Sequence, residues 1–252
     1  HRDAVVLVPC LTKHERIPEN PSLVRSIVRD GNFRQTGMQQ NKGIPTDANR
    51  VIHMNTTLVL ASGSEIRAQL LKNAGVSFVK QVARVDEDMV RQSLEAEQAS
   101  PRDIADALAE MKARKVSEKH TDALVLGCDQ VLDFQGTILA KPDSRETARA
   151  QLKMMRGQRH MLLSAAVIYE NGRPIWRHVG QVRMLMRQSS DAYIDAYVDR
   201  NWQSIRHAVG CYKLEEEGVR LFTRVDGDYF NVLGLPLLEL LAFLMLRGDL
   251  EQ

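Results

Sequence analysis

The chain has 252 residues, enough for one large domain or for a medium domain with an extension. Its 34 basic and 32 acidic residues leave a formal net charge of +2, a balance that argues against a sequence-independent nucleic-acid binder. The three cysteines lack disulfide-framework or metal-knuckle spacing, and no apolar run is long enough for a membrane span. With no visible signal peptide, we expect a cytoplasmic protein that binds neither nucleic acid nor membranes.

The first fifty-odd residues differ in composition from the rest of the chain. The stretch 1–53 contains four prolines, many polar residues and no sustained hydrophobic periodicity. Met54 comes shortly before residues 58–61, which have the composition of a buried strand. We therefore expect a folded domain over 54–252, preceded over 1–53 by a flexible extension or an overlong gene prediction. A small added structural element is the alternative.

From residue 58 onward the hydrophobic pattern alternates between strands and helices. It predicts strands over 58–61, 77–85, 123–127, 137–140, 160–169, 175–187 and 219–225. It predicts helices over 64–74, from Ser100 onward, over 144–155 and 190–200, and after Pro236. Strands outnumber simple crossover connections, which predicts an α/β fold with a mixed sheet and flanking helices.

Asp129 and Lys141 form the first candidate site. Asp129 comes just after the predicted strand 123–127, and open α/β sheets place their ligands at the carboxyl ends of strands. Lys141 follows the next predicted strand and can face the same cleft. A carboxylate can bind a divalent metal or deprotonate a water, and a lysine can neutralise a phosphate. The pair fits a turn aspartate beside a surface lysine equally well.

A turn of small residues joins the first predicted strand to the first predicted helix. The backbone N–H groups of residues 62–64 would form an anion site at the helix N-terminus. Ser62 and Ser64 add hydroxyl donors, and Arg67 adds a guanidinium group. The spacing is not that of a P-loop, and the same residues would serve as an ordinary helix cap.

Three further groups have weaker signals. The acidic run 86–88 could bind Mg²⁺ or form a solvated loop. Lys112 lies on a predicted helix, where a lysine is usually a surface residue. Tyr212 and Glu215 could read a nucleotide base by stacking and hydrogen bonding, or they could be a buried tyrosine and a turn.

Taken together and in this order, the segments resemble the Maf family of nucleotide pyrophosphatases. The motifs that carry the resemblance are Leu60-Ala61-Ser62-Gly63-Ser64 with Arg67, Asp86-Glu87, Lys112-Ala113, Gly127-Cys128-Asp129-Gln130-Val131, Lys141-Pro142, Gly157, His160, Gly227-Asp228 and Gly234-Leu235-Pro236. The resemblance implies an inosine-triphosphatase-like fold with two lobes around a deep cleft, usually in a homodimer. It also implies cleavage of a nucleoside triphosphate between the α- and β-phosphates, with Mg²⁺ or Mn²⁺ as cofactor.

The resemblance also implies roles for individual residues. Asp129 matches the catalytic general base, and Glu87 matches an acidic position that helps Asp129 to hold the metal. The positions that match phosphate-binding residues are Ser62, Arg67, Lys112 and Lys141. Cations at such positions have a physical reason, because pyrophosphate leaves with high negative charge.

The chain departs from the family pattern in ways that bear on the substrate. Ile66 stands where the family often has an arginine, and the acidic Glu65 precedes it. Gln130 and Glu215 are more similar to the subgroup that acts on 7-methyl-GTP than to the members acting on dTTP or UTP. A carboxylate accepts hydrogen bonds from guanine and favours a positively charged methylated base. We therefore expect a 7-methyl-GTP-like substrate and base recognition by Gln130 and Glu215.

The alternative function belongs to a different class, a nucleotide-binding regulator of cell division or septum formation with weak or no catalysis. The missing arginine at position 66 and the added Glu65 favour it. Retention of Asp129, Lys112 and Lys141 favours the enzyme.

Overall fold

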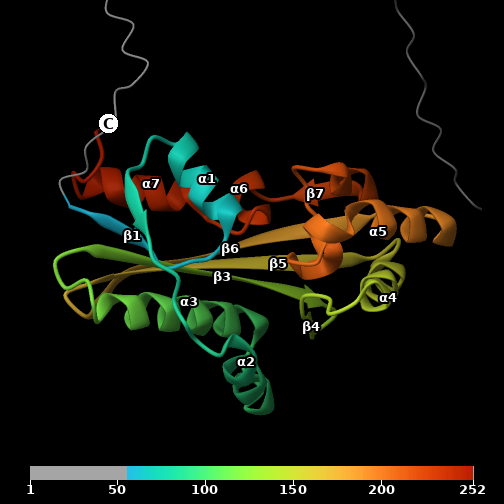
Figure 1. Cartoon of the computed structure of the whole chain (residues 1–252), viewed down its shortest axis with the longest axis horizontal. Coiled ribbons are helices and arrows are strands. Elements are labelled where there is room, and N and C mark those ends of the chain that lie inside the picture. Colours follow the sequence, from blue (N-terminus) through green and yellow to red (C-terminus); the bar gives the residue numbers. More distant parts are fainter. Residues whose placement is uncertain (1–55, 252) are drawn as a thin grey trace, which may run out of the picture. The chain divides into compact units, whose positions relative to one another are not determined.

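The computed structural model describes residues 56–251, which form a seven-stranded mixed sheet with helices on both faces (Figure 1). The predicted extension 1–53 lies outside the described residues. The strands are β1 (Leu58–Leu60), β2 (Phe78–Lys80), β3 (Leu124–Phe134), β4 (Thr137–Leu139), β5 (Arg159–Glu170), β6 (Arg173–Met186) and β7 (Phe222–Asp226). Their order is β2-β1-β3-β5-β6-β7, with β4 also paired to β3. The β1 pairings with β2 and β3 are parallel and the others antiparallel, so the predicted mixed α/β fold is confirmed.

Seven α-helices surround the sheet in this part of the chain. They are α1 (Glu65–Asn73), α2 (Glu87–Ala96), α3 (Pro101–Ser117), α4 (Arg145–Met155), α5 (Asp191–Ile205), α6 (Tyr229–Val232) and α7 (Leu237–Leu246). The N-cap serines Ser64, Ser100, Ser144 and Ser190 begin α1, α3, α4 and α5, and each accepts a backbone N–H from the first turn. These local caps explain why the helix starts predicted from the sequence agree with the structure.

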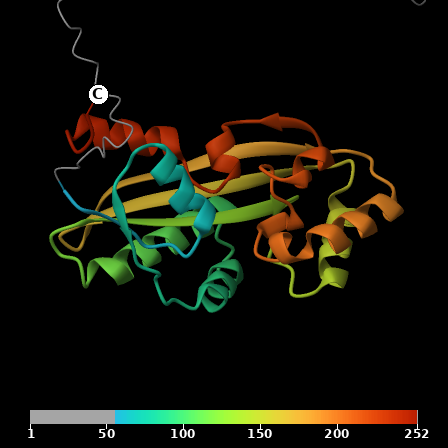
Figure 2. The same cartoon turned by 45° about the horizontal axis from the view of Figure 1, so that its top comes forward.

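The helices divide the core into three parts (Figures 1 and 2). The helix α3 covers one face of the sheet, with α2 beside it, and buries Ile104 and Leu108 against β3 and β5. On the other face, α1 and α7 cover β1 and the first half of β3. At the far end, α4 and α5 pack with each other and with the ends of β5, β6 and β7. Helices therefore cover both faces of the sheet.

Two predicted strands are shorter in the structure than expected, and one helix was not predicted. The strand predicted over 77–85 is paired only over Phe78–Lys80, because β2 has β1 as its one partner and β1 ends at Leu60. The chain then runs irregularly to α2, a helix that the sequence reading did not predict. The strand predicted over 219–225 begins instead as a 3₁₀ turn, Glu217–Leu221, and β7 follows it.

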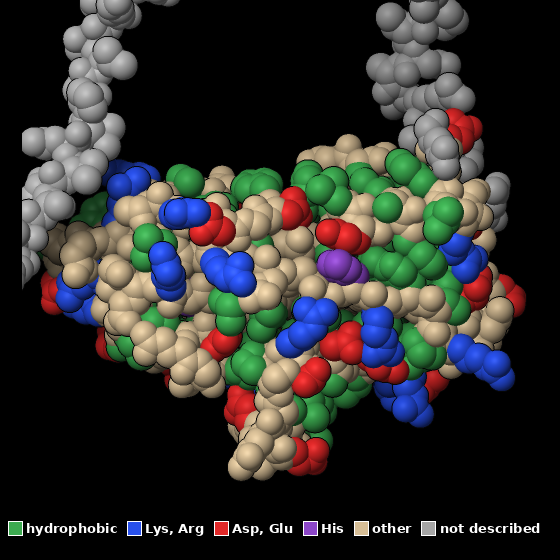
Figure 3. All heavy atoms as spheres, turned by 180° about the vertical axis from the view of Figure 1, so that it is seen from behind, with side chains coloured by type: hydrophobic (Ala, Val, Ile, Leu, Met, Phe, Trp, Pro, Cys, Tyr) green, Lys and Arg blue, Asp and Glu red, His purple; other side chains and the backbone are tan. Residues whose placement is uncertain are grey.

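The surface mixes side chains of different kinds on the face shown in Figure 3. Basic and acidic groups alternate there, with hydrophobic side chains between them. Among residues 56–251, none of the helices combines the length and apolar character needed to cross a membrane.

Candidate active site

One edge of β3 is interrupted, and Asp129 lies at the interruption. On one side β5 pairs with β3 along residues 125–133. On the other side β1 pairs only with residues 124–126, and β4 only with 132–134. Between them, no strand of the described chain pairs with β3. The expectation that Asp129 follows a strand end is therefore wrong, because Asp129 lies in mid-strand at a gap left by two short neighbours.

Close packing of α3 on β3 brings a lysine to this gap. A Cβ atom on Gly127 would lie 2.1 Å from the carbonyl oxygen of Ala109 and 2.5 Å from the nitrogen of Ala113. Only glycine permits this approach. Lys112 lies on the same turn of α3, and its Nζ donates to Oδ1 of Asp129 at 2.7 Å.

Lys112 connects two carboxylates. Its Nζ lies 2.7 Å from Oδ1 of Asp129 and 2.9 Å from Oε1 of Glu87. The side chains of Lys112 and Asp129 are 8% and 10% exposed, whereas that of Glu87 is 43% exposed. Burial raises the pKa of Asp129, and the positive charges of Lys112 and Arg67 oppose this rise. Asp129 is therefore more basic than an ordinary aspartate, which suits it to accept a proton from water.

The three acids of the run 86–88 lie at the start of α2 and have different partners. Asp86 is the N-cap of α2 and accepts a backbone N–H of the first turn. Asp88 pairs with Arg91 at 2.8 Å. Of the three acids, Glu87 alone reaches Lys112, so α2 brings one carboxylate to Asp129 and uses the other two for its own stability.

A cleft of about 850 Å³ opens at the gap in β3. Its wall includes Asp129, Gln130, Glu87 and Lys141, so the structure brings four of the predicted site residues together. Lys112 lies beneath this wall and touches the two carboxylates. Lys141 and Arg84 line the cleft without a hydrogen bond or ion pair to any residue between 56 and 251. These two cations are free to meet a negatively charged ligand.

The predicted anion turn lies next to the gap, but its side chains are not among the residues that line the cleft. Ser64 is the N-cap of α1, and Ser62 Oγ accepts from the nitrogen of Ser64 and from Nη1 of Arg67, both at 3.2 Å. Glu65 is 88% exposed and pairs with Lys80. The added acid at position 65 is thus neutralised by a neighbour on β2.

Arg67 is 8% exposed, and its guanidinium group is hydrogen-bonded to the backbone. Its Nη1 donates to the carbonyl oxygen of Cys128 at 2.9 Å, and its Nε donates to that of Gly234 at 2.7 Å. The predicted phosphate-binding arginine therefore lies beside Asp129 but below the cleft surface.

Gln130 lines the cleft with its amide held from behind. Its Nε2 lies 3.0 Å from Ser164 Oγ and 3.0 Å from the carbonyl oxygens of Asn231 and Val232. Because carbonyl oxygens only accept hydrogen bonds, the amide nitrogen must face them. Oε1 is therefore left as an acceptor for a ligand in the cleft.

The second predicted base-reading group is not assembled in the structure. Tyr212 is 4% exposed, and its hydroxyl lies 2.7 Å from Nε2 of His160 inside the core, as the alternative of a buried tyrosine predicts. Glu215 is exposed and is not part of the cleft wall. The apolar part of that wall comes instead from Val85, Leu108, Val131, Ile138, Leu139, Ala140 and Val209.

The carboxylates of Asp129 and Glu87 suit a divalent cation that takes only one or two ligands from the protein. Within residues 56–251 there is no cluster of three or more His, Cys, Asp and Glu side chains suited to a metal. Mg²⁺ commonly binds through one or two carboxylates and completes its shell with water and substrate phosphates. Two carboxylates that both reach Lys112 Nζ fit that mode, in which a nucleotide supplies further ligands.

Arg84 is a cleft residue that was not predicted from the sequence. It falls within the strand predicted over 77–85, but the structure places it in the irregular segment between β2 and α2, where its side chain is exposed and lines the cleft. A signal was present, since Arg84 comes two residues before the acidic run.

Comparison with known proteins agrees with this geometry. A family profile described as "Maf-like protein" matches residues 57–246. Proteins named "Nucleoside triphosphate pyrophosphatase" from Ruegeria pomeroyi and Ruegeria sp. are 72% and 68% identical, each over 79% of this chain and 100% of their own length. A protein from Brucella abortus named "7-methyl-GTP pyrophosphatase" is 45% identical over 75% of this chain and 95% of its own.

A solved structure of a Mycobacterium abscessus nucleoside-triphosphatase, titled dITP/XTP pyrophosphatase, covers 76% of this chain and 95% of its own. It has a TM-score of 0.36 at 13% identity, too low for a fold argument. The family assignment rests on the profile and on the relatives whose full length is matched. The chain belongs to the Maf family.

Proposed function

We propose that this chain hydrolyses a nucleoside triphosphate to the nucleoside monophosphate and pyrophosphate. The observation that carries the proposal is the buried contact of Lys112 with Asp129, at the floor of a cleft that also holds two unpaired cations. The pyrophosphatase names of the Ruegeria relatives support the same reaction.

The proposed reaction begins with a water molecule next to Asp129. Asp129 accepts a proton from the water, the water oxygen attacks the α-phosphorus, and the bond from that phosphorus to the bridging oxygen breaks. Pyrophosphate leaves with the electron pair of that bond, and Lys141 and Arg84 neutralise its charge. Lys112 keeps Asp129 in place. A divalent cation held by Asp129 and Glu87 would supply further charge neutralisation at the phosphates.

The base preference that we propose is for a 7-methyl-GTP-like purine over dTTP and UTP. Gln130 supports it, because its held amide leaves Oε1 as an acceptor, and guanine presents two adjacent N–H donors on its pairing edge where uracil and thymine present one. The name of the Brucella abortus relative also supports it. Glu215 adds no support, since its side chain lies outside the cleft wall.

A nucleotide panel tests the proposal. Pyrophosphate release is measured with 7-methyl-GTP, GTP, UTP and dTTP, with Mg²⁺, with Mn²⁺ and with a chelator. We expect release that needs the metal and is fastest with 7-methyl-GTP. A preference for the pyrimidines would contradict the base assignment alone, whereas full activity in chelator would contradict the metal. The homodimer implied by the resemblance stays a prediction, as does the cytoplasmic location.

The regulatory alternative predicts a different result from the same panel. A binding protein without catalysis would take up nucleotide but release no pyrophosphate beyond the trace given by Asp129→Asn. The structure weakens one of the two features that favoured this alternative, because Lys80 neutralises Glu65. The other feature, the missing arginine at position 66, remains.

A further inference from the structure

Arg67 completes a β-ladder that β1 leaves unfinished. The carbonyl oxygen of Leu126 accepts from the nitrogen of Ala61 at 2.8 Å, at the end of β1. Carbonyl groups two residues apart point to the same side of a strand, so the Cys128 oxygen is next in line. A buried carbonyl needs a partner, and Nη1 of Arg67 donates to it at 2.9 Å. Arg67 thus takes the place of a strand residue directly before Asp129.

The same guanidinium group links the Cys128 carbonyl to the segment that follows α6. Nε of Arg67 donates to the carbonyl oxygen of Gly234 at 2.7 Å. On the other side of Asp129, the Gln130 amide donates to the carbonyl oxygens of residues 231 and 232. Both neighbours of Asp129 in the chain are therefore tied to residues 231–234.

Residues 231–234 are themselves firmly held. Asp228 accepts hydrogen bonds from the backbone and the side-chain nitrogens of Asn231, both at 3.0 Å. Ser164 Oγ donates to the Asn231 carbonyl at 2.7 Å. The Asn231 side chain packs on Gly180, where a Cβ atom would lie 1.8 Å from its Oδ1. The hydrogen bonds that tie the neighbours of Asp129 to residues 231–234 therefore end on a segment that is itself held in place.

We propose that Arg67 is a positioning residue for Asp129, and that it does not bind the substrate phosphates. Two of its three guanidinium nitrogens donate to backbone carbonyls, its side chain is buried, and it does not line the cleft. The unpaired Lys141 and Arg84 are there to meet the phosphates. This inference rests on the proposed role of Asp129, whose reaction depends on placement to within a fraction of an ångström.

Arg67→Lys separates positioning from phosphate binding. Lysine keeps the positive charge, but it cannot donate along the two directions of the guanidinium fork. We expect kcat to fall by about tenfold to a hundredfold, while KM and the calorimetric dissociation constant for pyrophosphate stay unchanged. Lys141→Met gives the opposite pattern, weaker pyrophosphate binding. Arg102→Met is the matched control, because Arg102 also donates to a backbone carbonyl, Val179 O at 3.3 Å, and should keep full activity.

Gly234→Ala tests the same hydrogen bonds without changing Arg67 itself. A Cβ atom there would lie 3.1 Å from Nη2 of Arg67, and the φ of Gly234 is +92°, so alanine displaces both the carbonyl and the guanidinium. We expect the same fall in kcat with pyrophosphate binding intact. This variant carries the test if a thermal melt shows that Arg67→Lys does not fold.

Two results would overturn the inference. One is pyrophosphate binding that weakens in Arg67→Lys as much as in Lys141→Met. The other is a wild-type kcat in both Arg67→Lys and Gly234→Ala. A wild-type protein that releases no pyrophosphate from any nucleoside triphosphate would contradict the proposed function instead.

Discussion

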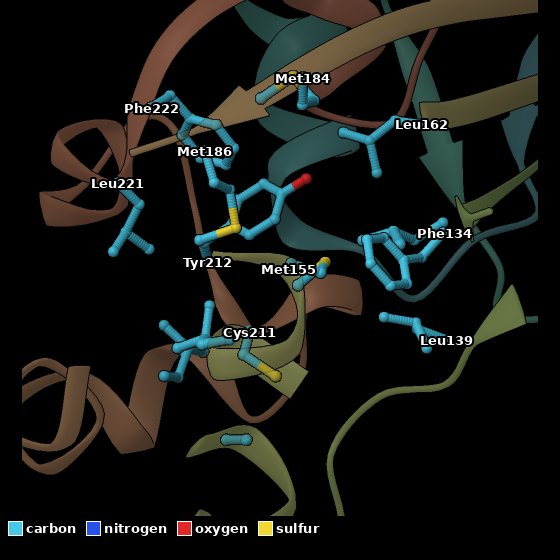
Figure 4. Packing of buried hydrophobic residues seen from close by; sticks show 14 of the residues in the cluster. Phe134, Leu139, Met155, Leu162, Met184, Met186, Cys211, Tyr212, Leu221 and Phe222 are labelled. Carbon is cyan, nitrogen blue, oxygen red and sulfur yellow. The ribbon is translucent and has the colours of Figure 1, made fainter. Parts of the chain in front are cut away.

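The cleft and the core around α4 and α5 both bury polar side chains. Those in the cleft are charged, whereas those in the core are neutral. In the core, His160 and Tyr212 share one hydrogen bond of 2.7 Å, and Tyr212 lies among methionine, leucine and phenylalanine side chains (Figure 4). Burial lowers the pKa of His160 to about 4 and raises that of Tyr212, so both stay neutral. In the cleft, Lys112 holds two carboxylates together.

The difference separates a structural group from a functional one. A neutral pair needs few partners and can be closed off by apolar side chains. A buried charge needs an opposite charge nearby, and the cost of burying both is repaid by contacts within the protein or with a ligand. The charged group lies at the 850 Å³ cleft, where a ligand can reach it. We therefore expect substitutions in the cleft to change activity, and substitutions in the core to change stability.

Asp129→Asn should give the largest effect. We expect pyrophosphate release to fall by about 10²- to 10⁴-fold, because the amide cannot accept a proton from water. Asp133→Asn is the matched control, since Asp133 lies on the same face of β3, is similarly buried and caps the turn at Gly136. A comparable loss in both variants, measured under the same conditions, would show that Asp129 has no special role.

Lys112→Met should break the charged group. We expect a loss of about 3 kcal/mol in the free energy of unfolding, because two carboxylates remain without their cation. Adding Asp129→Asn to this variant should restore most of that loss. Urea unfolding of the single and double variants measures it. Lys153→Met is the control, because the ion pairs of Lys153 with Asp191 and Asp195 lie nearer the surface. Equal stability of Lys112→Met and the wild type would mean that the contact is not a charged one.

The pH dependence of stability should reveal the neutral group. His160 has a pKa near 6.5 when unfolded and about 4 when folded, so the unfolded state binds more protons between these values. Stability should be complete above pH 6.5 and fall by about 3 kcal/mol as the pH is lowered towards 4.

His160→Gln should remove this part of the slope, because glutamine does not titrate. His178→Gln changes a partly exposed histidine outside that core and serves as the control. Urea unfolding at several pH values measures the slope. If the slope of stability against pH persists in His160→Gln, the titration of His160 is not its cause.

Lys141→Met should give the smallest effect. We expect KM to rise by about tenfold from the loss of one phosphate contact, with no change in melting temperature, because Lys141 has no partner among residues 56–251. Steady-state kinetics and a thermal melt measure the two quantities. A lowered melting temperature would place Lys141 with the structural groups.

Local signals made much of this arrangement predictable from the sequence. Serine caps and hydrophobic spacing located α1, α3, α4 and α5, and the motif around Asp129 pointed to the cleft. Tertiary effects were not predictable in the same way. The gap beside Asp129 depends on where β1 and β4 stop: β1 pairs with a segment far along the chain, and β4 ends after three residues of its hairpin with β3. The role of Arg67 depends on Gly234, 167 residues further along the chain.

The proposed reaction cleaves a nucleoside triphosphate between its α- and β-phosphates, and its products identify it. Phosphorus NMR can follow the products of 7-methyl-GTP or GTP with wild type and Asp129→Asn side by side. We expect nucleoside monophosphate and pyrophosphate with the wild type, and unchanged substrate with Asp129→Asn. Orthophosphate with nucleoside diphosphate, or the same products at the same rate from both proteins, would contradict the proposed reaction.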